Sequence, residues 1–154
     1  MHQKKMEVTT SLQIVCFKIG NEEYGIDILQ VQEILKVPKI TKLPKSRSHI
    51  MGVIDLRGKV IPIIDLGKKF GIISDLSNSS RTIVVDIDGK RVGLAIDSVS
   101  HVIKVDLNEI EPPPPVVKGI SGKYIVGIAK LKSGFVVILD INQIFSAEDL
   151  IIAD

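Results

Sequence analysis

Residues Gly52–Phe70 read GVIDLRGKVIPIIDLGKKF, and this stretch determines how we interpret the rest of the chain. Two runs rich in β-branched residues flank Arg57-Gly58, where glycine readily accepts a positive φ. The pattern predicts two antiparallel strands joined by a tight turn. Because Pro62 has no N–H, we expect the second strand to lie at a sheet edge or to carry a bulge. The last residues, Leu66–Phe70, are expected to form a helical turn that ends at Gly71.

The same pattern occurs a second time, about half a chain further on. Gly127–Phe145 reads GIAKLKSGFVVILDINQIF and aligns with the first copy without a gap. The basic residue in the turn recurs as well, since Arg57 aligns with Lys132. The similarity extends toward the start of each half, where Gly20 aligns with Gly89, Gly25 with Gly93 and Val31 with Val99. A duplicated sequence predicts two structural units of the same kind.

Each half also begins with a hairpin pattern. In the first half, apolar runs within 12–19 and 23–29 flank a Gly-Asn turn, and in the second half runs within 83–87 and 91–96 flank an Asp-Gly turn. Residues 31–37 fit either a strand or a helical turn, and we favour extended structure because β-branched residues are frequent there. A short helix is expected over 46–51, with a serine as its cap.

Short strands with glycine-centred turns and little helix predict an all-β fold. We expect residues 11–154 to form one domain of two small β-barrels, built from repeats at about 12–74 and 81–150, with strand exchange between them left open. Each half alone is near the lower size limit for an independent core, so the two barrels should share a large interface. Residues 1–10 are interpreted as a flexible tail, 75–80 as a linker between the halves, and 146–150 as a short helix.

Composition excludes several classes of function. The chain has 20 basic and 18 acidic residues, spread along its length, whereas nucleic-acid-binding proteins usually carry a basic stripe or patch. The lone cysteine, Cys16, cannot form an intrachain disulfide, which fits a reducing cytoplasmic setting. The apolar runs are too short for a membrane span, and the first ten residues lack a secretory signal. We therefore expect no membrane insertion.

We find no candidate catalytic residues, metal-ligand set or cofactor motif in the sequence. The three histidines are scattered, and Cys16 lies in an apolar strand pattern that favours an inert buried thiol over a nucleophile. Asp65 and Asp140 occupy matching repeat positions and suggest an acid pair, but a carboxylate at a strand end that accepts backbone N–H bonds explains both more simply. A β-rich body without catalytic groups favours a binding module.

Two other classes of function are weighed against a protein-binding module. Small five-stranded barrels often bind oligonucleotides, and this alternative would require exposed aromatic side chains and basic strands. A hydrolase or transferase would have to use the Asp65/Asp140 pair.

The segments EEYGIDILQVQEIL, residues 22–35, and GVIDLRGKVIPIIDL, residues 52–66, resemble the CheW family of bacterial chemotaxis coupling proteins. The similarity covers roughly 12–150. It implies two intertwined five-stranded barrels of the SH3/OB-like type and no catalytic activity. It also implies a cytoplasmic scaffold that joins the cytoplasmic tips of methyl-accepting chemotaxis receptors to the regulatory domain of the histidine kinase CheA. No cofactor, metal or nucleic acid is implied.

The resemblance also implies a partner-binding site. Val31 and Glu33 in VQE, and Gly52 and Arg57 in GVIDLRG, correspond to family positions associated with partner binding. The family commonly has Asn before LRG, whereas this chain has Asp55, which places a carboxylate two residues from Arg57. We expect these five residues to form or border the site. On the residues alone, Gly52 is equally explained by a backbone requirement, and Val31 by the core.

Overall fold

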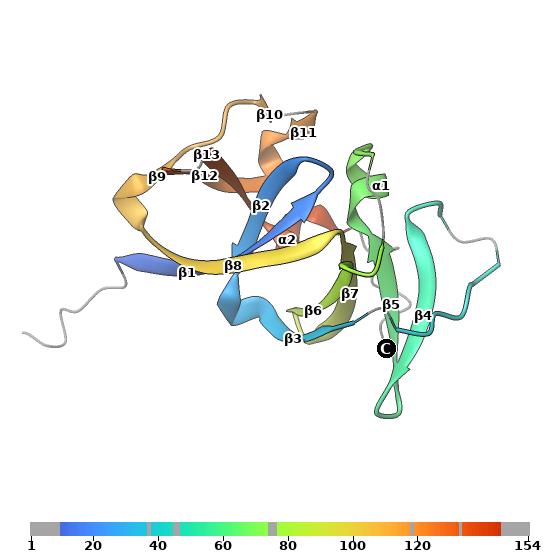
Figure 1. The fold of residues 1–154 in the computed structure, drawn as a ribbon. Coiled ribbons are helices and arrows are strands. Elements are labelled where there is room, and N and C mark those ends of the chain that lie inside the picture. The colour runs from blue at the N-terminus through green and yellow to red at the C-terminus, as the bar shows by residue number, and fades with distance from the viewer. Residues whose placement is uncertain are drawn as a thin grey trace, which may run out of the picture.

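Two curved β-sheets and a few short helices make up the structure, a computed structural model (Figure 1). This confirms the predicted all-β class. None of the helices in the described part of the chain is long and apolar enough to cross a membrane. The predicted N-terminal tail before residue 10 and the helix predicted over 146–150 lie outside the described residues. The structure describes residues 10–36, 38–44, 47–73, 77–117, 119–132 and 134–145.

The first sheet, at the lower right of Figure 1, has five strands. They are β3 (Val31–Leu35), β4 (Ile50–Leu56), β5 (Lys59–Asp65), β6 (Arg81–Ile87) and β7 (Lys90–Ile96). Their order is β3-β6-β7-β5-β4, so β3 and β4 are the edge strands. α1 (Leu66–Phe70) follows β5 and ends at Gly71, as predicted.

The second sheet has six strands in the order β8-β1-β2-β13-β12-β9. They are β1 (Ser11–Ile19), β2 (Glu22–Asp27), β8 (Ser98–Asp106), β9 (Ile110–Glu111), β12 (Ile125–Leu131) and β13 (Gly134–Leu139). A separate small ribbon pairs β10 (Val116–Val117) with β11 (Ile120–Ser121). The short helices are the 3-10 turns Ile28–Gln30, Leu107–Glu109 and Gly122–Tyr124, together with α2 (Ile141–Ile144).

The N-terminal hairpins of the two halves are exchanged between the sheets. The β1–β2 hairpin comes from the first half but lies in the sheet of β8, β12 and β13. The β6–β7 hairpin comes from the second half and lies with β3, β4 and β5. In Figure 1 the blue β1–β2 hairpin accordingly sits among yellow and orange strands. Each sheet is therefore built from both halves of the sequence.

Two equivalent parallel junctions hold the exchanged hairpins in place. Ile138 of β13 pairs with Gly25 of β2, and Ile63 of β5 pairs with Gly93 of β7. A Cβ on Gly93 would lie 2.5 Å from Ile63 Cδ1, and one on Gly25 would overlap Ile14 Cγ2. Both positions need glycine because a branched side chain of a neighbouring strand, on β1 for Gly25 and on β5 for Gly93, already occupies the place of a Cβ. The alignment of Gly25 with Gly93 thus reflects one packing requirement met twice.

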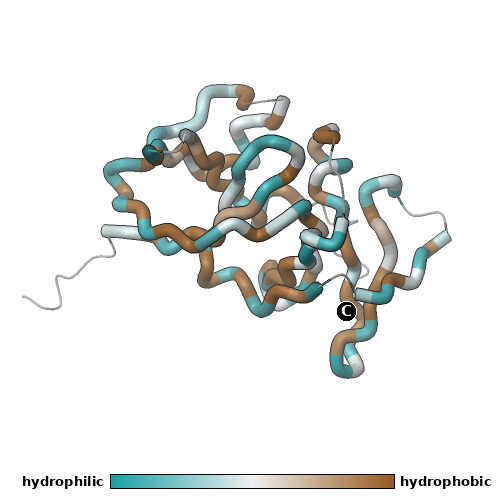
Figure 2. Tube along the Cα trace, viewed as in Figure 1, coloured by the Kyte–Doolittle hydropathy of each residue, from teal (hydrophilic) through white to brown (hydrophobic). Residues whose placement is uncertain are grey.

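Three groups of buried side chains follow from this arrangement. The largest, which includes Phe17, Tyr24 and Leu94, draws on strands of both sheets. One smaller cluster around Ile14 and Cys16 lies within the six-stranded sheet, and another, around residues 54 to 63, lies within the five-stranded sheet. β1 contributes alternate residues to two of these clusters and is therefore buried on both faces. Figure 2 shows the same contrast between apolar strands and hydrophilic turns.

Two local predictions were wrong. Pro62 lies in β5, which is flanked by β4 and β7 and is not an edge strand, and the one register shift between β4 and β5 falls on β4, between Ile50 and Gly52, not at Pro62. Its ladder to β7 begins one residue later, at Ile63, so the missing N–H falls outside that ladder. The helix expected over 46–51 does not form in its described part, because Ile50 and Met51 already belong to β4. Tertiary pairing outweighs the serine cap signal there.

The parallel junction predicts the effect of adding one methyl group. Gly25→Ala should lower the free energy of unfolding by about 1–3 kcal/mol, because the new Cβ meets the branched Ile14 side chain in a packed core. Urea denaturation followed by circular dichroism measures the change. A loss below about 0.5 kcal/mol would show that the Ile14 side chain can move aside at no cost, contrary to this description.

Candidate functional site

The turn between β4 and β5 is a rigid two-residue connection. Arg57 has φ 52° and Gly58 has φ 85°, so both occupy the left-handed region of a type I′ turn. The Asp55 carboxylate accepts a hydrogen bond from the Gly58 N–H at 2.9 Å. Asp86 and Gly89 repeat this bond, at 2.8 Å, in the β6–β7 turn. Asp55 thus fixes the turn that presents Arg57 to solvent.

Arg57 forms an ion pair with Glu33. Its Nη2 donates to Glu33 Oε1, and the two side chains are 67% and 30% exposed. Glu33 lies on edge strand β3, whereas Arg57 follows edge strand β4, so the ion pair links side chains from the two edges of the five-stranded sheet. An exposed pair of this kind contributes about 0–1 kcal/mol to stability. Its main effect is to hold a guanidinium and a carboxylate in a fixed orientation at the surface.

The five predicted site residues are placed differently. Glu33, Asp55 and Arg57 come together at the β3 and β4–β5 surface. Val31 is half-buried and packs against the largest core cluster, at the start of the same edge strand. Gly52 is buried, at the opposite end of β4 from the turn.

The sequence repeat of Gly52 has a clear packing cause. Its φ is 145°, and a Cβ there would overlap the Thr41 carbonyl and lie 2.8 Å from Ile40 Cγ2. Thr41 forms two backbone hydrogen bonds with Val53, of 2.8 and 2.9 Å, so the segment before β4 crosses directly over this glycine. The aligned Gly127 faces the same constraint, because its Cβ would lie 2.7 Å from the Glu111 carbonyl oxygen. Gly52 therefore supports the site through the backbone.

Sequence reasoning missed two features of this surface. The Arg57–Glu33 pair joins residues from different strands, and no pattern within either segment indicates it. Two apolar side chains also lie exposed nearby in the sheet: Ile34 on β3, 42% exposed, and Val60 on β5, 49% exposed. Side chains alternate between the two faces of a strand, so Ile34 shares its face of β3 with the polar Gln32. Exposure of Ile34 could therefore have been predicted from the sequence.

The second copy of the hairpin carries a different charge pattern. At the positions aligned with Arg57 and Glu33 it has Lys132 and His101. His101 Nδ1 instead lies 3.8 Å from Glu23 Oε2, on a strand two places away in the six-stranded sheet. The two copies share their backbone frame and differ in the groups they present.

The candidate catalytic groups have structural roles. Asp65 accepts a hydrogen bond from the Lys68 N–H at 3.1 Å and caps α1, and Asp140 accepts one from Asn142 at 3.2 Å and caps α2. This confirms the simpler interpretation of both carboxylates. Cys16 is fully buried, and desolvation together with the Glu23 charge raises the pKa of its thiol to about 12. A thiol of that pKa is a poor nucleophile at neutral pH.

The aromatic side chains give little support to oligonucleotide binding. All six lie in the described residues, and only Phe135, at 59%, is largely exposed. Base stacking requires exposed rings along a basic surface. Phe17, Tyr24 and Phe145 are buried in the main core cluster.

Comparisons with known proteins agree with this architecture. The CheW-like domain model matches residues 13–149. The chemotaxis protein CheW of Klebsiella aerogenes is 35% identical over 148 residues, covering 95% of this chain and 89% of the relative. CheW of Treponema pallidum is 30% identical, covering 97% of this chain and 93% of the relative. The crystal structure of the scaffolding protein TtCheW from Thermoanaerobacter tengcongensis superposes with a TM-score of 0.84 at 41% identity, covering 97% of this chain and 96% of that chain.

Two interlocked sheets joined by exchanged hairpins define a duplicated β-rich fold of the kind found in the scaffolding protein TtCheW. More narrowly, this chain belongs to the CheW family of chemotaxis scaffold and coupling proteins, because the family model and the relatives span most of its length. The resemblance seen in YGIDI and GVIDLRG is thereby confirmed.

Two glycines of the same hairpin separate backbone strain from steric overlap. Gly58→Ala should cost about 1–2 kcal/mol of stability, because φ is 85° but nothing lies within 4 Å of the added Cβ. Gly52→Ala should cost about 3 kcal/mol or more of stability. Its positive φ strains the backbone of an alanine, as at Gly58, and its Cβ would in addition overlap the Thr41 backbone. Urea denaturation of both variants provides the comparison. Equal losses would argue against the close approach over Gly52.

The buried thiol predicts a pH dependence of stability. The pKa of Cys16 is about 12 in the folded state against 9.0 for a free thiol, so above pH 9 the unfolded chain binds fewer protons. Stability should therefore fall as pH rises from 9 toward 12, by about 1–2 kcal/mol from this group at pH 10.5. Burial also raises the pKa of Tyr24, which acts in the same direction. Urea unfolding at pH 8 and 10.5 should show a smaller loss in Cys16→Ala; an identical loss would contradict the assignment.

Proposed function

We propose that this protein is a non-enzymatic adaptor that couples methyl-accepting chemotaxis receptors to the histidine kinase CheA. It would contact the regulatory domain of CheA and the cytoplasmic tip of the receptors. In this proposal the chain works in the cytoplasm and is recruited to receptor clusters at the inner face of the membrane. Family membership and the duplicated, interlocked body support the proposal.

The observation that carries the proposal is the Arg57–Glu33 pair at the exposed meeting point of β3 and the β4–β5 turn. A guanidinium that is already oriented loses little side-chain entropy when it binds a partner. Val60, the cross-strand partner of Asp55 on β5, supplies exposed apolar surface beside the turn. Apolar anchors beside a charged group are typical of protein interfaces, where the charge sets orientation and the apolar area supplies affinity.

Each of the five predicted residues has a role in this proposal. Arg57 and Glu33 meet the partner directly, and Asp55 holds the turn that positions Arg57. Val31 borders the site from the start of β3, and Gly52 keeps β4 seated beneath the preceding segment.

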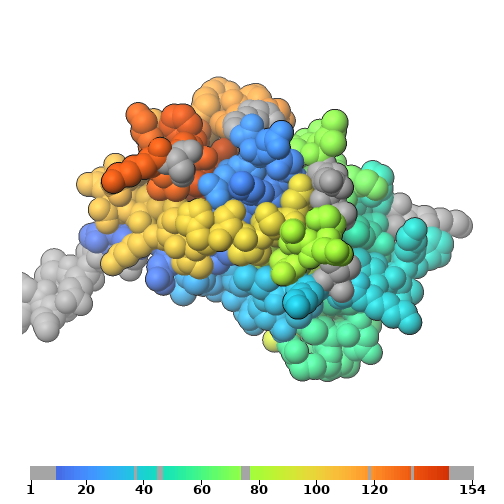
Figure 3. Space-filling model, in the orientation of Figure 1, coloured from blue at the N-terminus to red at the C-terminus, as the bar shows by residue number. Residues whose placement is uncertain are grey.

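The two edge strands β3 and β8 provide a second region suited to a helical receptor tip. Ile34 on β3 aligns with Val102 on β8, and both are exposed, at 42% and 51%. Figure 3 shows the yellow β8 residues lying next to the cyan residues around β3 on one face of the molecule. Exposed apolar side chains of this kind can contact the apolar stripe of a helix.

The test is reconstitution with receptor-containing membranes and CheA. Arg57→Glu should reduce co-sedimentation of this protein at least tenfold and lower receptor-coupled CheA autophosphorylation, because reversing an interface charge typically costs more than 1.4 kcal/mol. The free energy of unfolding should change by less than about 1 kcal/mol, since the pair is exposed.

The matched control is Lys132→Glu, which reverses the basic residue at the equivalent turn of the second copy. It should leave assembly within about twofold of the wild type if the first copy carries the contact. Unchanged kinase output in the presence of the wild-type protein, or equal losses in both variants, would contradict the proposal.

A further inference from the structure

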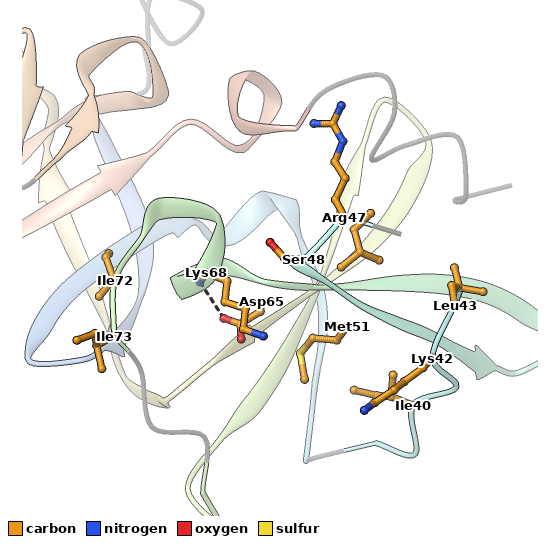
Figure 4. Close-up of a pocket in the computed structure, with 11 residues that line it drawn as sticks. Ile40, Lys42, Leu43, Arg47, Ser48, Met51, Asp65, Lys68, Ile72 and Ile73 are labelled. Atoms are coloured by element: carbon orange, nitrogen blue, oxygen red, sulfur yellow. Dashed lines mark hydrogen bonds between the residues drawn. The ribbon is translucent and has the colours of Figure 1, made fainter. Parts of the chain in front are cut away.

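An open groove of about 780 Å³ lies between α1 and the segment that precedes β4. Figure 4 shows Ile72 and Ile73 along one side, Ile40 and Lys42 along the other, and Asp65 with Lys68 between them. Ile73 is 91% exposed, the highest exposure of any large apolar side chain in the described residues. With Ile40, Met51 and Ile72 it gives the groove a continuous apolar lining, and contiguous apolar surface is characteristic of an interaction site.

The groove lies apart from the charged turn. It begins beside Ile50 and Met51 at the base of the β4–β5 hairpin, whereas Arg57 is at the tip. Each strand has seven residues, so roughly 20 Å separates the two regions. No residue of the Arg57–Glu33 pair lines the groove.

The groove combines its apolar side chains with a basic rim. Lys42, Arg47 and Lys68 line it, and all three are exposed. Among the described residues that line the groove, Asp65 is the one carboxylate, and it is only 6% exposed and is engaged with the Lys68 N–H. The accessible charge of the groove is therefore positive.

We propose that this groove binds an acidic segment of a partner protein, in which apolar side chains lie next to carboxylates. The apolar side chains would cover Ile40, Met51 and Ile73, and the carboxylates would face Lys42 and Lys68. The lining comes from three separate parts of the chain, so the occupant must be long enough to touch all of them, as a polypeptide segment is. Charge complementarity selects an acidic segment over a basic one.

A pair of labelled peptides tests the proposal on the full chain. The probe is EELLEELLEELL, and its matched control is KKLLKKLLKKLL, which has the same apolar pattern with opposite charge. Fluorescence anisotropy at low ionic strength should show saturable binding of the acidic peptide, at least tenfold tighter than that of the basic peptide. Added salt should weaken the binding, because the rim charges are exposed.

Variants locate the binding. Ile73→Ser, and separately the double variant Lys42→Glu/Lys68→Glu, should each weaken binding of the acidic peptide at least tenfold. Lys130→Glu, at an exposed position of β12, and Arg57→Glu should leave it within twofold. Urea denaturation checks that every variant is folded. Because Arg57→Glu should impair coupling to CheA but not binding of the acidic peptide, the groove proposal and the coupling proposal can each be contradicted without the other.

Other occupants give other results, and each would overturn the proposal. If truncation after Phe145, which removes SAEDLIIAD, creates acidic-peptide binding that the full chain lacks, the groove is taken by this chain's own end. If the full chain sediments as a dimer that Ile73→Ser dissociates, a second copy covers the groove. Equal affinity for both peptides, or equal loss in Lys130→Glu, would show non-specific binding.

Discussion

The structure depends on the parallel pairing of each exchanged hairpin with a strand from the other half of the chain. Gly25 against Ile138, and Gly93 against Ile63, are the points where this pairing occurs. A side chain at either glycine would force the strands apart, because the neighbouring branched side chains already fill the space. Neither sheet can be completed without the other half, so the two halves should fold as one unit.

This interlocking explains how a duplicated chain can present different groups at equivalent positions. The glycines at strand crossings and the apolar residues of the cores recur because both copies solve the same packing problem. The turn residues do not share that constraint, so Arg57 and Lys132 can differ in their surroundings. Positions where the two copies share a backbone conformation but differ in side chains are the best candidates for function. The Arg57–Glu33 pair is such a position.

Local patterns predicted much of the fold, because hairpins with two-residue turns leave a strong signal. The Arg57-Gly58 and Asp88-Gly89 turns are both where the sequence placed them. The prediction of an edge strand at Pro62 was wrong, because a missing N–H requires only that this one position makes no ladder hydrogen bond. Whether the hairpins are exchanged could not be decided, since both arrangements bury the same residues and differ only in long-range pairing.

The candidate site was predictable in part. Arg57 and Glu33 were each indicated by family resemblance, but their contact links the two edges of the five-stranded sheet and has no local signature. Burial of Gly52 likewise depends on the segment crossing over it, which only the tertiary structure reveals.

If the first copy's turn and edge strand β3 form the surface that meets the kinase, binding must change the surroundings of their backbone amides. Two-dimensional NMR of the isotopically labelled chain, during titration with the regulatory domain of CheA, measures this change residue by residue. We expect the largest amide shift changes on Glu33 and on Asp55 to Gly58. Changes centred on Lys132 and β12, with Arg57 and Glu33 unaffected, would contradict it.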